Sequence, residues 1–335
     1  MRYAVAACQT NFACPKDRRE IADRVDRMLA MIDGAVLGYR PFFPIRLVVF
    51  PEFAHAAPVY TTVAELREHL AVPVPNEHTE RYVDKAREHQ IHIQTGTFIE
   101  FDQNWPGVLF NTTCLIGPTG ILSKYRKVNP WIPWEVHASP HDVPGYTDEL
   151  FPVARTEIGN LGCAICYDWL FPEAIRQLAW NGAEVLIRVS AYMDPWGATP
   201  PMDWWTVINR SRAIENLAYV VAANQGATLQ HYRPFSWPGG SMVVDFDGRL
   251  LAQADPGPGE KVVVAEIDLA ALREARSRRL GHNPIAHLRR EAYRGAPHGY
   301  PSGSHTAAAS PLGNRTVEDN EQAIRRALSE IRAQS

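Results

Sequence analysis

Short apolar runs of strand length recur along most of this chain, and amphipathic helical patterns separate several of them. The helical patterns begin near residue 16 and cover residues 77–89, 172–181, 202–216 and 269–279. The expected strands are residues 3–8, 47–50, 92–98, 110–116, 121–125, 161–166, 185–189, 219–223, 240–244 and 261–267. Strands and helices of these lengths, mixed along one chain, predict an α/β layered fold.

Turn signals indicate that the sheets are mixed and that the strands belong to one unit. The Pro-Thr-Gly at 118–120 and the Asp-Phe-Asp-Gly at 245–248 are typical of hairpin connections, so some neighbouring strands are antiparallel. No internal repeat or low-complexity linker interrupts residues 1–280, which we interpret as one domain. A helix-breaking Gly-His-Asn-Pro follows. Residues 281–335 are interpreted as a C-terminal extension that ends in a helical pattern at 317–332.

Composition argues against several classes of function. A net charge of -3, with scattered basic residues, provides no basic groove for nucleic acid. No segment approaches the roughly 20 apolar residues that a membrane span needs. The five cysteines lack disulfide-framework spacing, and the first residues resemble a strand more than a signal peptide. We therefore expect a cytoplasmic protein without nucleic-acid or membrane partners.

One apolar run ends abruptly at Cys166. The sequence from Gly162 to Glu173 predicts a buried strand, a polar and aromatic turn and then a helix, with Pro172 suited to its first turn. A thiol at a strand-to-helix turn lies close to backbone N–H groups, which favours a nucleophilic cysteine. The alternative is a small core residue, because free cysteine is among the residue types most often buried.

Two other predicted strands also lead into residues of catalytic type. Residues 47–51 lead to Glu52, and residues 121–126 lead to Lys127. Eight residues after Lys127, Glu135 closes the segment Pro-Trp-Ile-Pro-Trp-Glu. A glutamate, a lysine and a cysteine, each just past a strand, resemble the signature of the nitrilase superfamily of carbon–nitrogen hydrolases. The second glutamate, within its Pro-Trp-x-Pro-x-Glu segment, makes the sharper resemblance to the aliphatic amidase and formamidase branch.

The resemblance implies a fold and an assembly that periodicity alone does not give. The fold is an α-β-β-α sandwich, in which two mixed sheets pack face to face with helices outside. Even-numbered homo-oligomers are typical of the superfamily, so we expect a dimer or a higher even-numbered assembly. C-terminal extensions in this family wrap around a neighbouring subunit, and we expect the same of residues 281–335.

The same resemblance assigns roles to the four residues. Cys166 would attack the amide carbonyl, and Glu52 would take the thiol proton and later activate water. Lys127, helped by the backbone N–H of Tyr167, would stabilise the oxyanion. Glu135 would orient the substrate amide or relay a proton to the departing ammonia. A strand-end glutamate or a basic cluster is usually a solvated surface feature, but the joint occurrence in the family's order favours catalysis.

Other features of the sequence carry less weight. Cys163 and Cys166 form a C-x-x-C pattern, but no second Cys/His pair follows at ligand spacing, so we expect no metal and no cofactor. Enzymes that hydrolyse nitriles usually carry Cys-Trp-Glu at the nucleophile. This chain has Cys-Tyr-Asp at residues 166–168, which favours amides. His137 is interpreted as a loop residue.

Aromatic residues gather in the segments expected to surround the substrate. The substrate-binding candidates are Trp131, Trp134, Trp169 and Tyr192, with Trp196, Trp204 and Trp205 in the same segments. An aromatic-walled pocket suits a small uncharged amide, although core packing is the commoner use of tryptophan.

The resulting hypothesis is a cysteine-dependent amidohydrolase that converts a small carboxamide to a carboxylic acid and ammonia through a thioester. The alternative is an N-carbamoyl or ureido hydrolase, which would need a cation for the substrate carboxylate, and Arg188 or Arg212 could supply it. A catalytically silent scaffold is disfavoured because all four catalytic residues are present. Nitrile hydrolysis is disfavoured by the residues that follow the nucleophile.

Overall fold

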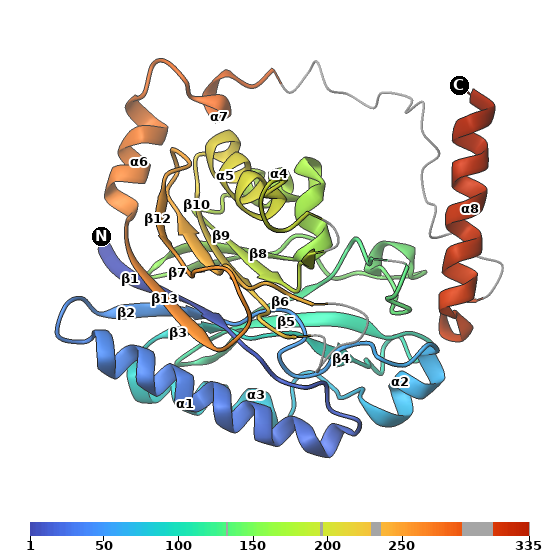
Figure 1. Ribbon diagram of the computed structural model, residues 1–335. Coiled ribbons are helices and arrows are strands. Elements are labelled where there is room, and N and C mark those ends of the chain that lie inside the picture. Colours follow the sequence, from blue (N-terminus) through green and yellow to red (C-terminus); the bar gives the residue numbers. More distant parts are fainter. Residues whose placement is uncertain (132, 195–196, 229–235, 290–310, 335) are drawn as a thin grey trace.

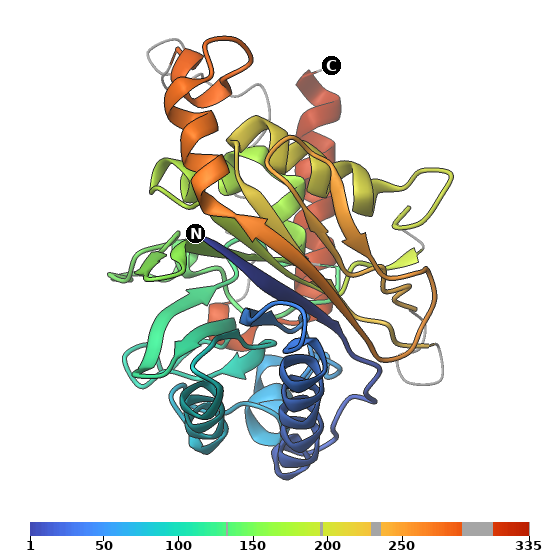
Figure 2. The same ribbon diagram turned by 90° about the vertical axis from the view of Figure 1, so that its left-hand side faces the viewer.

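Two β-sheets pack face to face between layers of helices in the computed structural model, which describes residues 1–131, 133–194, 197–228, 236–289 and 311–334 (Figure 1, Figure 2). The first sheet has the order β13 (Lys261–Asp268), β1 (Arg2–Gln9), β2 (Ile45–Val49), β3 (His92–Gln94), β5 (Phe110–Gly117) and β4 (Phe98–Glu100), with β6 (Gly120–Arg126) paired to β5. The second has the order β12 (Leu250–Gln253), β11 (Met242–Val244), β10 (Tyr219–Asn224), β9 (Val185–Ser190), β8 (Gly159–Ile165) and β7 (Val153–Thr156). Both sheets mix parallel and antiparallel pairs, which confirms the predicted sandwich of mixed sheets.

Side chains of the central strands alternate between two apolar layers, because successive residues of a strand point to opposite faces of its sheet. On β1, Ala4 and Ala6 pack in the layer between the first sheet and its helices, whereas Val5 and Ala7 face the second sheet. On β9, Val189 joins the same layer between the sheets. These strands are therefore buried on both faces, and the polar groups that chemistry requires are left to the strand ends.

Amphipathic helices cover the outer face of each sheet. The first sheet is covered by α1 (Ile21–Tyr39), α2 (Val63–His69) and α3 (Glu77–His89), and the second by α4 (Pro172–Trp180) and α5 (Trp204–Asn216). The remaining helices are α6 (Leu269–Arg278), α7 (Pro284–His287) and α8 (Val317–Gln334), and the 3₁₀ turns are η1 (Arg18–Glu20), η2 (Pro140–Asp142), η3 (Cys166–Leu170) and η6 (Leu312–Asn314). Within the described ranges, no helix combines the length and hydropathy that a membrane span requires.

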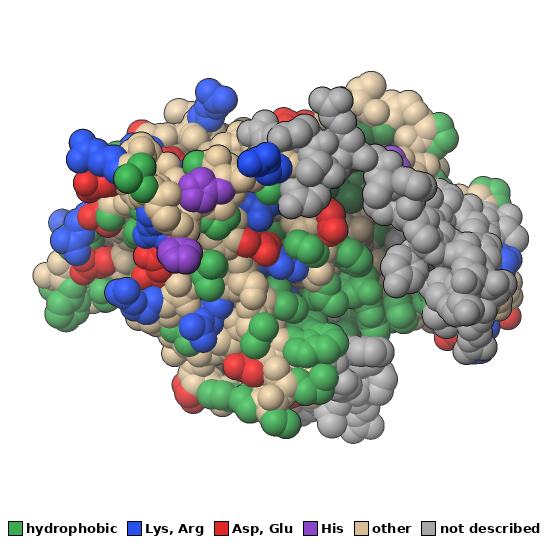
Figure 3. All heavy atoms as spheres, turned by 90° about the horizontal axis from the view of Figure 1, so that it is seen from above, with side chains coloured by type: hydrophobic (Ala, Val, Ile, Leu, Met, Phe, Trp, Pro, Cys, Tyr) green, Lys and Arg blue, Asp and Glu red, His purple; other side chains and the backbone are tan. Residues whose placement is uncertain are grey.

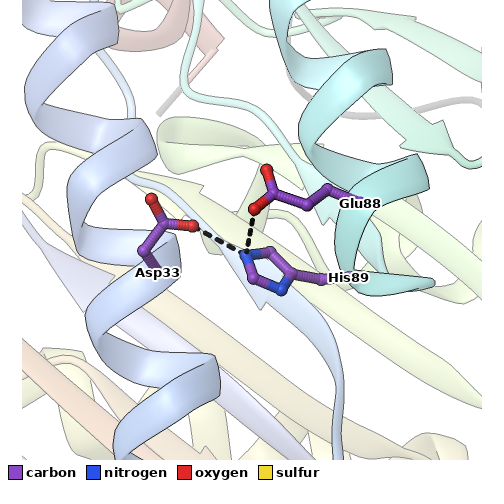
Figure 4. Close-up of side chains that lie close together, drawn as sticks. All are labelled: Asp33, Glu88 and His89. Carbon is purple, nitrogen blue, oxygen red and sulfur yellow. Dashed lines mark hydrogen bonds and ion pairs between the residues drawn. The ribbon is translucent and has the colours of Figure 1, made fainter.

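Ion pairs hold α1 against α3. Asp33 Oδ1 on α1 lies 2.7 Å from His89 Nε2 on α3 (Figure 4), and the Lys85 ammonium donates to the two Asp33 oxygens at 2.9 and 3.0 Å. Lys85 also pairs with Glu88 at 2.8 Å. Asp33, Glu88 and His89 are close enough to share a metal ion, but Lys85 already supplies positive charge to both carboxylates. We therefore interpret this cluster as an ion-pair network, in which each exposed pair contributes about 1 kcal/mol or less.

Most expected elements are confirmed, but the expected strand 92–98 is in fact two strands. β3 and β4 each pair with β5, and the strand structure is interrupted between them near Gly96. A Cβ atom at Gly96 would come within 2.6 Å of Ala54 Cβ and 2.7 Å of the Pro51 carbonyl oxygen. The strand is interrupted because the turn that carries Glu52 packs directly on this glycine. The periodicity does not predict β7, β12 or α2, which are short.

Hydrophobic side chains gather on the outer face formed by α4 and α5. Seen from above, this side of the molecule shows a contiguous hydrophobic area (Figure 3). The large hydrophobic residues exposed on these two helices are Trp180, Trp204, Val207 and Ile214. Exposed apolar patches of this kind mark surfaces that bind a partner more often than scattered single residues do.

Residues 316–323 of the C-terminal extension pack against the main domain of their own chain. Thr316 forms an isolated β-bridge with Thr62, and Ala323, in the second turn of α8, is 1% exposed. Figure 1 shows the rest of α8 extending away from the sheets. Packing of residues 281–335 on a neighbouring subunit stays a prediction.

Candidate active site

The four predicted catalytic residues line one cavity. Glu52, Lys127 and Cys166 each lie within three residues of the end of a strand, namely β2, β6 and β8. Glu135 lies in the loop that follows Lys127. The exposed fractions of Glu52, Lys127, Glu135 and Cys166 are 1%, 1%, 2% and 8%. Together they border a cavity of about 260 Å³. Because β2 and β6 belong to the first sheet and β8 to the second, the cavity lies where the two sheets meet.

Cys166 occupies a sharp turn between β8 and α4. Its φ is 43°, in the left-handed region that non-glycine residues rarely adopt. Asp168, two residues later, is fully buried and accepts hydrogen bonds from the Tyr125 hydroxyl at 2.7 Å and the Asn129 N–H at 2.8 Å. Tyr125 and Asn129 flank Lys127 in the sequence. Asp168 therefore ties the cysteine turn to the segment that carries the lysine, and holds the strained backbone in place.

The turn that carries Glu52 is fixed by hydrogen bonds from three directions. Phe53 has a φ of 61°, and its N–H donates to Thr97 Oγ1 at 2.9 Å. Gln225 Nε2 donates to the Glu52 carbonyl oxygen at 2.9 Å. The Ala191 N–H donates to Glu52 Oε2 at 3.1 Å. These bonds direct the carboxylate into the cavity and fix its orientation.

Lys127 lies between the two glutamates. Its Nζ donates to Glu52 Oε1 at 2.8 Å and to both carboxylate oxygens of Glu135 at 2.8 Å. Asn111 Nδ2 adds a hydrogen bond to Glu52 Oε1 at 2.9 Å. The Trp131 N–H donates to the Glu135 carboxylate. One ammonium thus faces two carboxylates in a buried site, which leaves an excess of negative charge when both are ionised.

Burial and this uneven charge separate the pKa values of the two glutamates. Burial, opposed by Lys127 and reinforced by Glu135, raises the pKa of Glu52 to about 7. Burial acts in the same direction on Glu135, but Lys127 and His137 outweigh it and lower the Glu135 pKa to about 2. Burial by itself lowers the pKa of Lys127, yet the two glutamates hold that pKa above its ordinary value. Glu52 is therefore suited to exchange a proton near neutral pH, while Glu135 stays ionised.

The nucleophile candidate needs such a base. Burial, together with the negative charge of Glu52, raises the pKa of the Cys166 thiol to about 12, against the opposing effects of Lys127 and Arg188. The thiol is therefore protonated at rest, and only the thiolate is a strong nucleophile. Glu52, beside the thiol and with a pKa near 7, can take that proton as the attack begins.

The aromatic candidates divide between the cavity wall and the core. Trp131, Trp134, Tyr167 and Tyr192 line the cavity. Trp169 does not line it, so the expectation that it binds substrate is corrected. Its side chain is fully buried in the apolar layer between the second sheet and the helices that cover it. Its Nε1 donates to the Ala164 carbonyl oxygen at 3.1 Å. The η3 turn directs residue 169 into the core because the preceding strand offers a carbonyl acceptor there.

The wider set of tryptophans is divided in the same way. Trp204 lines the cavity and is 40% exposed. Trp205, its neighbour on α5, is buried, and its Nε1 donates to the Gly240 carbonyl oxygen at 2.7 Å. Trp196 lies outside the described residues. The remaining wall of the cavity is apolar and consists of Phe53, Leu170, Ala191 and Met193.

The two arginines considered for a substrate carboxylate are turned away from the cavity. Arg188 is fully buried, with its guanidinium 4.3 Å from the ring centre of Trp205 and Nη1 bonded to Asn209 at 2.9 Å. Arg212 donates to the Trp169 carbonyl oxygen at 2.9 and 3.1 Å. Neither borders the cavity.

Several residues of the site were not predicted from the sequence. Asn111, the second residue of β5, donates to Glu52 at 2.9 Å and lies 3.5 Å from Glu135. A polar side chain at a buried strand position is the signal that identifies it. His137, expected as a loop residue, does lie in a loop, but it is 1% exposed and its Nε2 is 3.4 Å from Glu135. Cys163 packs in the core between the sheets, on the other side of the strand from Cys166.

The fold and these residues define a carbon–nitrogen hydrolase. The chain matches the family described as "Carbon-nitrogen hydrolase" over residues 4–277, and it belongs to that family. It is a nitrilase-superfamily protein near the amidase and formamidase branch, and a hydrolase of carbon–nitrogen bonds. Relatives include the formamidase of Bacillus thuringiensis (strain Al Hakam), 30% identical over 269 residues that cover 79% of this chain and 74% of the relative. The formamidase of Bacillus anthracis has the same identity and coverage.

Solved structures share the sandwich. Nit3 of Saccharomyces cerevisiae, described as a member of branch 10 of the nitrilase superfamily, superposes with a TM-score of 0.66 at 25% identity, over 82% of this chain and 93% of its own. The NitFhit protein of C. elegans gives a TM-score of 0.66 at 28% identity, over 87% of this chain and 66% of its own. An amidase of Nesterenkonia sp., at 20% identity, supports the fold with a TM-score of 0.62, over 87% of this chain and 95% of its own.

Proposed function

We propose that this amidohydrolase cleaves a small uncharged carboxamide to a carboxylic acid and ammonia through a thioester on Cys166. The observation that carries the proposal is the cavity itself. Its polar wall holds Cys166, a glutamate that titrates near neutrality, and an ammonium shared with a second glutamate. These are the nucleophile, the base and the oxyanion stabiliser that amide hydrolysis needs.

The first half of the reaction forms the thioester. The Cys166 sulfur attacks the carbonyl carbon while Glu52 takes the thiol proton. The carbonyl π electrons move onto oxygen, which Lys127 and the Tyr167 N–H stabilise. When the tetrahedral intermediate collapses, the C–N bond breaks and the proton held by Glu52 passes to the leaving nitrogen, so ammonia departs. Glu135 keeps the ammonium of Lys127 in place and orients the amide.

The second half releases the acid. Glu52, ionised again, takes a proton from a water molecule as its oxygen attacks the thioester carbonyl. The second tetrahedral intermediate collapses with cleavage of the C–S bond, and the proton returns from Glu52 to sulfur. Throughout both halves the total charge of the cluster stays constant. The negative charge moves from Glu52 to the substrate oxygen and back, and Lys127 faces two negative groups at every stage, so little reorganisation is required.

The cavity wall supports an uncharged substrate with an apolar acyl group. Apart from the reacting groups, the described lining is aromatic and aliphatic. Its charged members are Glu52, Lys127 and Glu135, which are bonded to one another, so no described lining residue offers an unshared cation to a carboxylate. A cavity of about 260 Å³ also exceeds the volume of formamide, and accommodates larger aliphatic or aromatic amides.

An N-carbamoyl amino-acid substrate is the second candidate, and one observation favours it. No described residue hydrogen-bonds Nε or Nη2 of Arg188, which is buried beside the site. Its guanidinium lies 5.4 Å from the ring centre of Tyr192, which itself lines the cavity. A rotation of Tyr192 would open a path from the cavity to this cation.

Ammonia release from a substrate panel tests the proposal. The panel holds formamide, acetamide, benzamide, phenylacetamide, N-carbamoyl amino acids and simple nitriles, assayed with the wild-type protein and Cys166→Ala. We expect turnover of the uncharged amides, loss of turnover in the variant, and an acyl adduct on the Cys166 peptide by mass spectrometry after rapid quenching. Turnover of N-carbamoyl amino acids alone would select the second candidate, and turnover that survives Cys166→Ala would contradict the mechanism.

We also propose that the protein acts as an even-numbered homo-oligomer. The apolar patch on α4 and α5 supports this, because Trp180, Trp204, Val207 and Ile214 would otherwise remain in contact with water. Sedimentation velocity of the wild-type protein and of Val207→Glu, at matched concentration, tests the assembly. We expect the variant to shift toward the monomer.

A further inference from the structure

The backbone of the second glutamate is held by the far end of the chain. Asn320, on the first turn of α8, is 2% exposed, and its Nδ2 donates to the Glu135 carbonyl oxygen at 2.9 Å. The Glu135 N–H, by contrast, is bonded within its own loop, to the Trp131 carbonyl oxygen at 3.0 Å. The N–H of Glu135 is therefore anchored within its own loop, and its carbonyl oxygen is anchored by a residue 185 positions further along the chain.

Asn320 is itself fixed by the start of α8. Thr316 caps this helix, because its hydroxyl accepts from the Asp319 N–H at 3.2 Å and its N–H donates to Asp319 Oδ2 at 2.9 Å. The Val317 N–H donates to the Thr61 carbonyl oxygen at 3.3 Å, which fastens the helix start to the loop before α2. The position of Asn320 thus depends on packing against the main domain and not on the outer turns of α8.

The segment before α8 packs close to Glu135, against residues just after it and against the start of β5. Leu312 packs against an apolar cluster that includes Phe110 and Ala138. Gly313 lies so close to the Gly107 carbonyl oxygen that a Cβ atom at residue 313 would come within 2.2 Å of it. Residues 312–323 therefore contact the loop that carries Glu135 at Glu135 and near Ala138, and also contact the loop before β5 at Gly107. This segment lies beyond the matched family region, residues 4–277.

We propose that Asn320 is a positioning residue that holds Glu135 against Lys127. The inference rests on the proposed function for its catalytic meaning, but the geometry that carries it is independent of the substrate. Glu135 binds Lys127 through both oxygens, an arrangement that requires the backbone of residue 135 to stay where it is. A donor lost at residue 320 leaves a buried carbonyl unpaired, and the loop relaxes toward other partners.

The expected consequence appears at Glu52. If Glu135 moves away from Lys127, the ammonium pairs more closely with Glu52, and one source of negative charge near Glu52 is removed. Both changes favour the ionised form of Glu52 and lower its pKa. The titratable and charged groups that face Glu52 and Cys166 are Lys127, Glu135, Arg188, Tyr167 and Tyr192, and His137 faces Glu135. None of these is altered by a substitution at residue 320, so a shift reports the movement of the loop.

The test compares Asn320→Leu, which keeps the branched shape and the number of heavy atoms and removes the donor, with Asn320→Ala and with Gln322→Leu as control. Gln322 is exposed on the same turn of α8. The first readout is the rate of Cys166 alkylation by iodoacetamide against pH, followed on the Cys166 peptide by mass spectrometry. The second is kcat and KM on whichever amide the panel identifies.

We expect both Asn320 variants to shift the pH midpoint of alkylation downward and to lower kcat roughly 10- to 100-fold with little change in KM, because misplacement by about 1 Å costs this much. Gln322→Leu should match the wild type in both. Wild-type alkylation and kinetics in Asn320→Leu, with a thermal midpoint confirming that it is folded, would overturn the inference. If Asn320→Leu does not fold, the alkylation profile and the kinetics of Asn320→Ala test the inference in its place. If the panel shows no turnover, the proposed function fails while the alkylation profile still decides the role of Asn320.

Discussion

Arg126 and Lys127 are consecutive residues with buried charges, yet their ion-pair networks differ in composition. Arg126 donates to Glu100 at 2.7 and 2.8 Å, and Lys124 adds a third bond to the same carboxylate at 2.9 Å. The Arg126 guanidinium also lies 4.4 Å from the ring centre of Phe110. Arg126 pairs with Asp102 and Asp148 as well, but both of these lie nearer the solvent, and the one fully buried carboxylate, Glu100, is bonded to two cations. At Lys127 the two carboxylates are both buried and share one ammonium.

This difference separates a structural network from a reactive one. The Arg126 network holds β4, β5 and β6 together, and none of its members borders the active-site cavity. The Lys127 network borders the cavity and carries an excess negative charge, which burial turns into a Glu52 pKa near 7. A buried charge alone is therefore weak evidence of function. A buried charge without full compensation, next to a cavity, is stronger evidence.

The largest effect should follow from removal of the thiol that the Lys127 network serves. Cys166→Ala should reduce turnover by roughly 10³-fold or more, since removal of a nucleophile leaves only residual binding effects. Cys163→Ala is the matched control, because Cys163 packs in the core between the sheets. It should keep its turnover and lose about 1 kcal/mol of stability in urea unfolding. Equal losses of activity in the two variants would contradict the assignment of the nucleophile.

The comparison of the two networks is tested by Lys127→Met and Arg126→Met. Removal of Lys127 should lower kcat by about 10²- to 10³-fold, because the oxyanion loses its cation. Removal of Arg126 should cost about 3–5 kcal/mol of unfolding free energy, because Glu100 is left buried with weaker compensation. The folded Arg126→Met protein should keep a kcat within a few-fold of the wild type. The measurement is kcat of both variants at a temperature below their thermal midpoints. An equal loss of kcat in the two variants would contradict the distinction between a structural and a reactive network.

The charge excess at Glu52 predicts the pH dependence of activity. Because the Glu52 pKa is about 7 and the base must be ionised, kcat/KM should fall about tenfold per pH unit below pH 7. A profile that stays flat down to pH 5 would exclude Glu52 as the base. Glu52→Gln should lose most of the activity and this dependence together.

The stability of the two glutamate sites should respond to pH in opposite directions. Glu52 has a pKa raised from 4.5 to about 7, so it stabilises the folded state below pH 4.5 and loses that contribution as pH rises to 7. Glu135 has a pKa lowered from 4.5 to about 2, so it stabilises the folded state above pH 4.5 and loses that contribution as pH falls toward 2. Glu52→Gln should therefore gain stability relative to the wild type between pH 5 and pH 8. Urea midpoints at those two pH values measure this, and an unchanged difference would contradict the raised pKa.

The smallest effect should come from the apolar wall. Trp204→Ala should raise KM for an aromatic amide by about three- to tenfold, which corresponds to roughly 1 kcal/mol of lost apolar burial, and leave KM for acetamide unchanged. Trp180→Ala, which removes an exposed tryptophan outside the cavity, is the control. A uniform rise in KM for both substrates would mean that Trp204 shapes the site as a whole and does not select the acyl group.

Much of the fold and of the reactive set follows from the sequence because both are encoded locally. Continuous apolar runs give strands that are buried on both faces, and the residues just after such a strand are placed at the edge of the sheet where the strand ends. Glu52, Lys127 and Cys166 are all of this kind. Glu135 is identified by a motif, because it lies eight residues after Lys127 and ends the segment Pro-Trp-Ile-Pro-Trp-Glu.

Other features depend on contacts between distant segments. The split between β3 and β4 reflects the packing of the Glu52 turn on Gly96. Trp169 and Trp134 look equivalent in sequence, but of the two only Trp134 lines the cavity, because Trp169 packs in the apolar cluster outside the second sheet.

The sequence by itself therefore determined the layers of mixed α/β structure, and its motifs, through their resemblance to the nitrilase superfamily, identified the sandwich and the four residues at the cavity. The tertiary structure alone decided how charge is shared among them. Asn111 on Glu52, Asp168 on the lysine segment and Asn320 on the Glu135 backbone all act through hydrogen bonds between segments far apart in the chain. A pKa near 7 for Glu52 arises from that three-dimensional arrangement. The carboxyl loses its contact with water, and comes close to Lys127 and Glu135, only in the folded protein.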